Sequence, residues 1–253
     1  MTSRYNSESE FLAAYDPAAY DRPSITADII IFSVSSDAGE NWRRADKKTF
    51  SVLLVHRDDY PFLGKWNLPG GFVGIRETSM DAAHRVLSRE TGLPRDIYVE
   101  QLFTFDSVDR DPRMRVFSIA FMALVNKNNL QYRENRTAKW FDVKLADGRL
   151  ILTDADGVRL SESELAFDHA EIIRAGILRL RNKIEYTDIV FDMMPPTFTL
   201  GELQQVYEAI LGKKLLAPAF RRTIAAKVRA TGKMQTGFGH RPSALFKYRG
   251  HAA

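Results

Sequence analysis

The sequence predicts an α+β fold in which a mostly β body is followed by a smaller, basic unit at the C-terminal end. Three observations lead to this prediction. Several β-rich runs, separated by two helical stretches, fill most of the first 190 residues. Pro195–Pro196 then interrupts the chain, and the remainder has the pattern of two short helices and a hairpin. With 45% hydrophobic and 27% charged residues, the composition is that of a globular protein.

The body is predicted to be a sheet with a helix on each face. Apolar and β-branched runs predict strands over residues 26–34, 50–57, 97–105, 114–125 and 138–143. A helix is predicted over residues 77–91, where Gly92 stops it, and a second one from about 168 to 183. This order of elements predicts an α/β/α sandwich. We divide the chain into domains of residues 1–190 and 191–253.

Composition excludes several function classes. The chain has no cysteine, so it has no disulfide, thiolate metal site or thiol nucleophile. The longest apolar run, residues 117–125, has the length of a strand and not the roughly 20 residues of a membrane span. The first residues lack the apolar core of a secretion signal. We expect a soluble, cytoplasmic protein with no membrane partner. The five histidines are scattered without metal-ligand spacing, so no metal site is predicted.

Basic residues are concentrated at the C-terminal end. From Lys213 onward the chain has ten Lys and Arg and no Asp or Glu, although the net charge of the whole chain is only +4. A purely basic segment after an acidic body predicts contact with a polyanion. The alternative is a basic disordered tail, but apolar anchors such as Phe220 and Phe246 argue against it.

A capping box marks the start of the first C-terminal helix. Thr199 and Glu202 have the spacing at which each side chain bonds the other residue's backbone N–H. A helix is therefore predicted to begin at Leu200 and to end at Gly212. A second helix is predicted over residues 218–230, because a proline stands at its first turn and a glycine just beyond it.

A hairpin is predicted after these helices, with strands over residues 234–239 and 244–249. Helix, turn, basic helix and hairpin is the order of a winged helix-turn-helix. In the second helix Phe220, Ile224 and Val228 recur every four residues and predict the buried stripe. The opposite face carries arginines and alanines, which suit a DNA groove; a solvated cationic face is the alternative.

We expect the cations of this unit to bind double-stranded operator DNA. The predicted contacts are Arg221, Arg222, Lys227, Arg229, Lys233, Arg241 and Lys247. Arg241 lies in the Gly-His-Arg-Pro turn, which has the form of a wing tip that enters a minor groove. Lys233 and Lys247 are expected on the phosphates.

A spaced motif in the body resembles the Nudix box, a loop–helix–loop that holds Mg²⁺ against a nucleoside diphosphate. Trp66-Asn-Leu-Pro-Gly-Gly71 stands where that family has its lead-in. The box positions in this chain are Gly71, Glu77, Arg85, Val86, Arg89, Glu90 and Gly92. The family places three clustered Glu where Val86, Arg89 and Glu90 stand here.

These departures predict a domain that has lost hydrolytic activity. Clustered carboxylates bind hard cations and can deprotonate a water, but Val86 and Arg89 carry none. We therefore assign no catalytic residue and expect no required cofactor, with Mg²⁺ relevant only to residual activity. Arg89 is expected to take the place of the metal against the diphosphate; a surface ion pair is its alternative role. Glu77 and Arg85 are expected to pair with each other.

Binding residues are predicted from the same resemblance. The stretch Asp109-Arg-Asp-Pro-Arg113 resembles one that ADP-ribose-type Nudix domains carry between two strands. Guanidinium groups bind phosphate bidentately, although surface salt bridges are the alternative for each arginine. The predicted ligand-binding residues are Arg57, Gly70, Gly71, Phe72, Arg89, Arg110 and Arg113.

A degenerate Nudix domain joined to a basic winged helix resembles the Nudix-related transcriptional regulators, the NrtR family. The resemblance spans nearly the whole chain and includes residues 198–208, Phe220-Arg-Arg222 and the Arg241-Pro242 turn. It implies a dimeric regulator of NAD-cofactor genes that senses ADP-ribose or a related nucleotide, and we expect a repressor. Because one short winged helix contacts few base pairs, we also expect a homodimer that binds an inverted repeat. The alternatives are an active ADP-ribose hydrolase, an RNA-binding Nudix relative and a pentose-catabolism regulator that senses a sugar.

Overall fold

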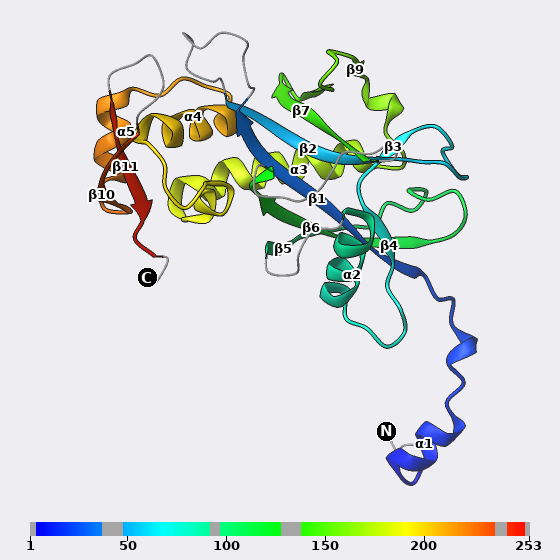
Figure 1. The fold of residues 1–253 in the computed structure, drawn as a ribbon. Helices are drawn as coiled ribbons and strands as arrows, with labels where there is room; N and C mark the ends of the chain where they lie inside the picture. Colours follow the sequence, from blue (N-terminus) through cyan, green and yellow to red (C-terminus); the bar gives the residue numbers. More distant parts are fainter. Residues whose placement is uncertain (1–3, 37–47, 92–96, 128–137, 236–241, 251–253) are drawn as a thin grey trace.

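The computed structural model describes residues 4–36, 48–91, 97–127, 138–235 and 242–250. Its body is one mixed sheet with the strand order β5-β6-β1-β2-β7-β8-β9, in which β3 pairs with β2 and β4 pairs with β1 (Figure 1). The five longer strands are β1 (Ser24–Ser36), β2 (Lys48–His56), β5 (Tyr98–Phe105), β6 (Val116–Val125) and β7 (Ala138–Ala146). The four shorter ones are β3 (Trp66–Asn67), β4 (Gly70–Phe72), β8 (Arg149–Thr153) and β9 (Arg159–Leu160).

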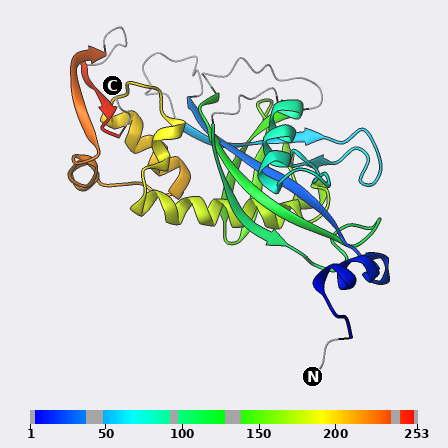
Figure 2. The same cartoon turned by 90° about the horizontal axis from the view of Figure 1, so that it is seen from below.

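Helices cover both faces of this sheet. Figure 2 shows the sheet between α2 (Ser79–Thr91) and α3 (His169–Tyr186). Alternate residues of β1 explain the two layers, because Ile29 and Ile31 face a core that includes α2 residues, whereas Ile30 and Phe32 face the core under α3. The predicted α+β class and α/β/α arrangement are therefore confirmed, while the short strands β3, β4, β8 and β9 were not predicted.

The C-terminal unit is a winged helix-turn-helix. A short 3-10 helix (Ile189–Met193) leads to α4 (Leu200–Leu211), α5 (Ala217–Ile224), β10 (Val228–Gln235) and β11 (Ser243–Tyr248). The capping box is present at Thr199 and Glu202, and Gly212 ends α4 with a φ of 70°. Both predictions for α4 are confirmed.

The second C-terminal helix is shorter than predicted. It ends at Ile224, and Val228 already pairs with Tyr248 across the hairpin. Val228 is still buried, so the four-residue recurrence of apolar residues continues through a change from helix to strand. Backbone pairing with β11 therefore overrides the helical pattern from Val228 onward. The predicted strand 234–239 is confirmed only at Met234 and Gln235, since residues 236–241 lie outside the described part.

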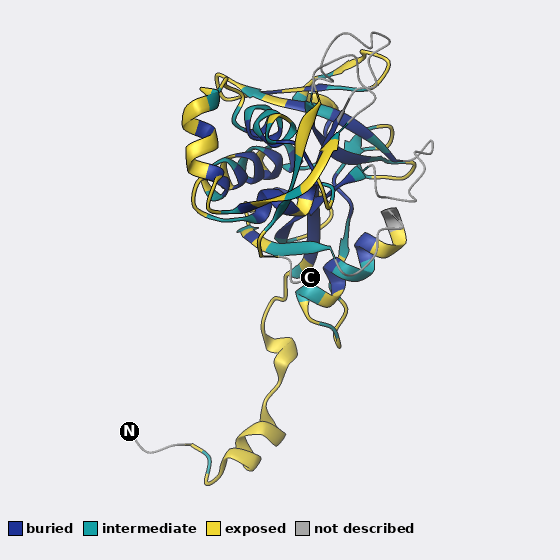
Figure 3. Ribbon diagram, turned by 60° about the vertical axis from the view of Figure 1, so that its left-hand side comes forward, coloured by how far each residue is buried: buried dark blue, intermediate teal, exposed yellow. Residues whose placement is uncertain are grey.

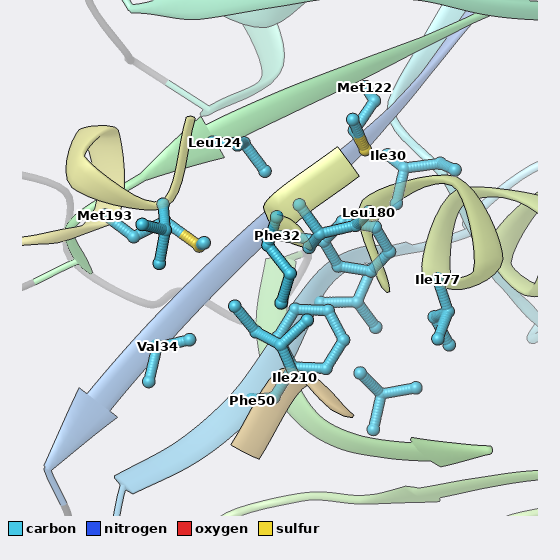
Figure 4. Close-up of a cluster of buried hydrophobic side chains, with 14 of the residues drawn as sticks. Ile30, Phe32, Val34, Phe50, Met122, Leu124, Ile177, Leu180, Met193 and Ile210 are labelled. Carbon is cyan, nitrogen blue, oxygen red and sulfur yellow. The ribbon is translucent and has the colours of Figure 1, made fainter. Parts of the chain in front are cut away.

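One hydrophobic core joins the body to the winged helix. It contains Phe32 and Phe50 from the sheet, Leu180 from α3 and Ile210 from α4, all at most 5% exposed. Figure 4 shows these side chains converging between β1, β2, α3 and α4. The core therefore fixes the winged helix against the sheet directly, and not through a flexible linker.

The N-terminal segment projects from the body. Its helix α1 (Glu8–Ala14) has no buried residue, and Figure 3 shows it exposed and away from the sheet. This helix was not predicted, although Ser7 caps it by accepting a hydrogen bond from the backbone N–H of Glu10. Across the described residues, no helix has the length and apolar character that crossing a membrane requires.

Candidate functional site

A cavity of about 220 Å³ opens where β1, β4 and the loop before α3 meet. Six of the seven residues predicted to bind a ligand line it along with six others, so the predicted group converges in space although it comes from distant segments. The six predicted residues are Arg57, Gly70, Gly71, Phe72, Arg110 and Arg113, and the others are Thr26, Asp28, Asn67, Asp111, Phe167 and His169. Arg89 is the predicted ligand residue that does not line the cavity.

Two arginines lie at the mouth of the cavity beside aromatic rings. The guanidinium carbon of Arg113 is 5.3 Å from the ring centre of Phe72 and 5.9 Å from that of Phe167. Arg57 lies 5.2 Å from the Phe167 ring centre and donates a hydrogen bond of 2.7 Å to the carbonyl of Pro61. Partial burial, and secondarily the charge of Arg113, lowers the pKa of Arg57. The mouth therefore combines guanidinium charge with stacking surfaces, as a nucleotide diphosphate requires.

Arg110 is held at the inner end of the cavity and is engaged by protein carboxylates. Its side chain is 3% exposed and donates two hydrogen bonds, of 2.8 and 2.6 Å, to Asp168. It also lies 3.6 Å from Asp28. Arg113 is paired as well, with Asp111, but its side chain is 40% exposed. Arg110 therefore braces the cavity wall, whereas Arg113 is within reach of a ligand.

The glycines of β4 allow the chain to approach β1 closely. A Cβ on Gly70 would stand 2.0 Å from a carboxylate oxygen of Asp28, so no other residue fits there without a rearrangement. A Cβ on Gly71 would stand 3.2 Å from Val86 and 3.8 Å from Arg89. The box helix therefore lies directly behind the glycine loop.

Glu77 and Arg85 pair as expected and hold that loop in place. Arg85 donates to both carboxylate oxygens of Glu77 and, at 2.9 Å, to the carbonyl of Phe72. The backbone N–H of Gly74 donates to Glu77 at 2.7 Å. The bonds from Arg85, and then that from Gly74, lower the pKa of Glu77 to about 2. This carboxylate therefore serves the loop's structure.

The described residues of the box do not fit a magnesium ion. Val86 is fully buried in the core beneath α2 and Arg89 is a cation. The side chain of Glu90, like Gly92, lies outside what the structure describes. Among the side chains that are described, no group of three His, Asp or Glu is arranged to hold a metal. We therefore derive no chemical step through Mg²⁺.

The predicted DNA-binding cations occupy three different settings. Arg221 and Arg222 are exposed on α5. Arg229 is exposed too, but on β10 and not on the helix, where it stands opposite Lys247 of β11. Lys233 is also exposed on β10, and Arg241 lies outside the described residues. Like charges directly opposite in a hairpin destabilise it, so this pairing favours an anionic partner.

The placement of Lys227 corrects the sequence analysis. Its ammonium group lies 2.7 Å from Asp188 and donates to the carbonyl of Thr187 at 3.0 Å. Tyr248 donates to the same Asp188 carboxylate at 2.7 Å. Lys227 therefore attaches the turn before the wing to the end of α3, instead of lying on a DNA-facing helix.

Sequence reasoning did not assign six of the cavity residues to ligand binding, and three of these bear most on the chemistry of the cavity. Asp28, Phe167 and His169 line it, although the histidines were given no role. A carboxylate within the apolar run of β1 was the available signal for Asp28. Phe167 has a φ of 52°, a conformation that non-glycine residues rarely adopt and that clusters at functional sites.

Two family models match the chain. The NUDIX domain model matches residues 42–160, and the model of the NrtR DNA-binding winged helix domain matches residues 190–248. Fold and site thus define a protein that joins a Nudix domain to a DNA-binding winged helix. The ADPR responsive transcriptional repressor NtrR of Acinetobacter baylyi is 33% identical over 252 residues, covering 96% of this chain and 89% of that protein. The chain belongs to the NrtR family of transcriptional regulators.

Two further similarities concern most of the chain and about half of it, respectively. The crystal structure of Shewanella oneidensis NrtR complexed with a 27mer DNA has a TM-score of 0.68 and 31% identity, covering 89% of this chain and 93% of that one. An ADP-ribose pyrophosphatase of Methanocaldococcus jannaschii is 34% identical over 129 residues, which cover 51% of this chain and 66% of that enzyme. The predicted family and fold are confirmed.

Proposed function

We propose that this chain is an ADP-ribose-responsive transcriptional repressor. Its Nudix domain, proposed as residues 1–190, binds the nucleotide without hydrolysing it, and residues 191–253 bind operator DNA. The observation that carries the proposal is a cavity with Arg57 and Arg113 at its mouth, beside a box whose carboxylate positions hold Val86 and Arg89. The repressor that matches 96% of the chain is named as responsive to ADPR, which supports the same ligand.

DNA binding is proposed to use Arg221 and Arg222 of α5 together with Arg229, Lys233 and Lys247 of the wing. The test is fluorescence anisotropy with the protein's own upstream DNA at fixed salt, with and without ADP-ribose. We expect ADP-ribose to change the operator affinity. An unchanged affinity at saturating ADP-ribose would contradict the proposed response.

Arg222→Ala tests the role of α5 in reading the operator. A bidentate base contact contributes about 1–3 kcal/mol, so we expect operator affinity to fall about tenfold or more. Arg149→Ala, an exposed arginine on β8, is the matched control and should bind as wild type does. Wild-type affinity for Arg222→Ala would show that α5 does not read the operator.

Hydrolysis is expected to be at background, and Mg²⁺ is proposed to be unnecessary for binding. The test is AMP release from ADP-ribose with Mg²⁺, alongside calorimetry of ADP-ribose binding in EDTA. Arg89→Glu should weaken binding in EDTA, because it places a carboxylate where Arg89 approaches the glycine loop. Clear AMP release would favour the alternative of an active hydrolase, for which the pyrophosphatase similarity over about half of the chain is the supporting observation.

A homodimer on an inverted repeat is proposed, with target genes in NAD-cofactor metabolism as the family resemblance implies. One short winged helix contacts too few base pairs to select a site in a genome, and two-fold symmetry doubles the readout. Light scattering during size exclusion should give twice the 28.8 kDa chain mass. A monomer that binds a single half-site would contradict this proposal.

A further inference from the structure

The cavity changes character from its mouth to its inner end. At the mouth, Phe72 is 42% exposed and the Arg113 side chain 40% exposed. At the inner end, Asp28 is 6%, Arg110 7% and His169 2% exposed. A ligand that enters the cavity therefore meets guanidinium groups and rings first, and a buried polar group last.

The inner end carries a net negative charge. Arg110 is shared between two carboxylates, since it donates twice to Asp168 and lies 3.6 Å from Asp28. Asp28 also accepts hydrogen bonds from the hydroxyls of Thr26 and Ser118. One guanidinium thus faces two carboxylates, which leaves the inner end unfavourable for a phosphate.

His169 adds a hydrogen-bond donor beside Asp28. Its Nδ1 accepts a bond of 2.9 Å from the backbone N–H of Leu68, so the proton of the neutral ring is on Nε2. Burial lowers the pKa of His169 and keeps the ring neutral. Nε2 lies 4.0 Å from Asp28 Oδ1. A donor and a carboxylate acceptor therefore stand side by side at the inner end.

The size of the cavity limits what enters it. Sites that enclose a whole drug-sized ligand have volumes of about 300–1,000 Å³. The cavity here is about 220 Å³, so it admits only one part of a molecule as large as ADP-ribose. That part has to be neutral and has to offer both hydroxyl donors and acceptors.

We propose that Asp28 and His169 form a subsite for the terminal ribose of the nucleotide, with the diphosphate held outside it by Arg57 and Arg113. Vicinal hydroxyls donate to a carboxylate and accept from an imidazole N–H, so a ribose satisfies both groups. The subsite selects ADP-ribose over nucleotides that end in phosphate. This inference rests on the proposed function, because it specifies how the same cavity reads its ligand.

The test is calorimetry in EDTA with ADP-ribose, ADP and ATP on wild type and Asp28→Asn. Wild type should bind ADP-ribose at least about tenfold more tightly than ADP, which lacks the terminal ribose. ATP should bind more weakly than ADP, because its third phosphate meets Asp28. Asp28→Asn should bind ADP-ribose about tenfold more weakly than wild type does. Its affinity for ADP should be unchanged, and the difference between its affinities for ADP and ATP should be smaller than in wild type.

Asp58→Asn is the matched control, since this carboxylate is exposed and next to Arg57; it should bind all three ligands as wild type does. Thermal unfolding checks that Asp28→Asn is folded. If this variant does not fold, the affinities of wild type for the three ligands still test the proposal. Equal affinities of wild type for ADP-ribose and ADP, or equal losses of both in Asp28→Asn, would overturn the ribose subsite. Failure of wild type to bind ADP-ribose at all would instead overturn the proposed function.

Discussion

At the scale of single residues, burial separates arginines that look equivalent in the sequence. Arg110 and Arg113 belong to one short segment, yet their side chains are 3% and 40% exposed. A buried guanidinium bound to Asp168 costs too much to release for a ligand, since breaking such a pair leaves a charge without compensation. Arg113 can rearrange at the mouth at lower cost. Ligand contact is therefore assigned to Arg113 and Arg57, and support of the wall to Arg110.

The ion pair of Glu77 and Arg85 gives a pH-dependent expectation. The pKa of Glu77 is about 2 in the folded protein and 4.5 without its partners. Its contribution to stability is therefore complete above pH 4.5 and is lost as the pH falls toward 2. Glu77→Gln should unfold at lower urea than wild type at pH 7, and this difference should shrink at pH 3.5. A difference that is constant over this range would contradict the role of the Glu77 charge.

At the scale of elements, α3 connects the cavity with the winged helix. His169, its first residue, lines the cavity, and Arg181 near its other end donates a 2.9 Å bond to the carbonyl of Ile210 at the end of α4. Beyond α3, Asp188 binds Lys227 in the turn before the wing and Tyr248 in the wing itself. One helix thus contacts both the ligand cavity and the DNA-binding unit.

Gly176 sets how closely α3 lies on β1. A Cβ there would stand 2.4 Å from Ile30 and 3.2 Å from Phe32, both buried. Gly176→Ala should therefore force α3 away from the sheet and lower the free energy of unfolding by about 1–3 kcal/mol. Gly201→Ala in α4 is the control, because its Cβ would meet only Thr199 at 3.8 Å. That variant should be as stable as wild type or slightly more stable, and chemical denaturation measures both.

At the scale of the whole molecule, the two domains share one core. Ile210 belongs to α4, is fully buried and lies in the same cluster as Phe32 and Phe50 of the sheet. The shared core predicts a single cooperative unfolding transition, because neither part can expose this surface without exposing the other's. It also gives α4 and α5 a defined position relative to the cavity.

Tryptophan fluorescence can test this coupling. All three tryptophans, Trp42, Trp66 and Trp140, precede the winged helix. Ile210→Ala should nevertheless shift the fluorescence transition, since it removes about 2–5 kcal/mol from a core that the body shares. Met234→Ala, at a half-exposed position on β10, should leave it unchanged. A fluorescence transition insensitive to Ile210→Ala would show that the two parts unfold independently.

The sequence by itself determined the features that depend on neighbours in the chain. The capping box at Thr199 and Glu202 needs a separation of three residues, and the pairing of Glu77 with Arg85 follows from the box spacing. The distribution of Lys, Arg, Asp and Glu along the chain is likewise read from the sequence, and it predicted the basic C-terminal unit. The main strands followed from the composition of each run. For these features local pattern and final structure agree.

Only the tertiary structure decided which distant residues meet. Leu68 and His169 are 101 positions apart and share a hydrogen bond, and Ser118 reaches Asp28 from another strand. The sequence pattern predicts Lys227 in a helix, but in the structure the pairing of the hairpin places it beside Asp188. The role of each such group depends on a partner that the packing of the sheet and helices supplies. Spacing along the chain carries no information about that partner, because the sheet order, and not the sequence order, sets which side chains become neighbours.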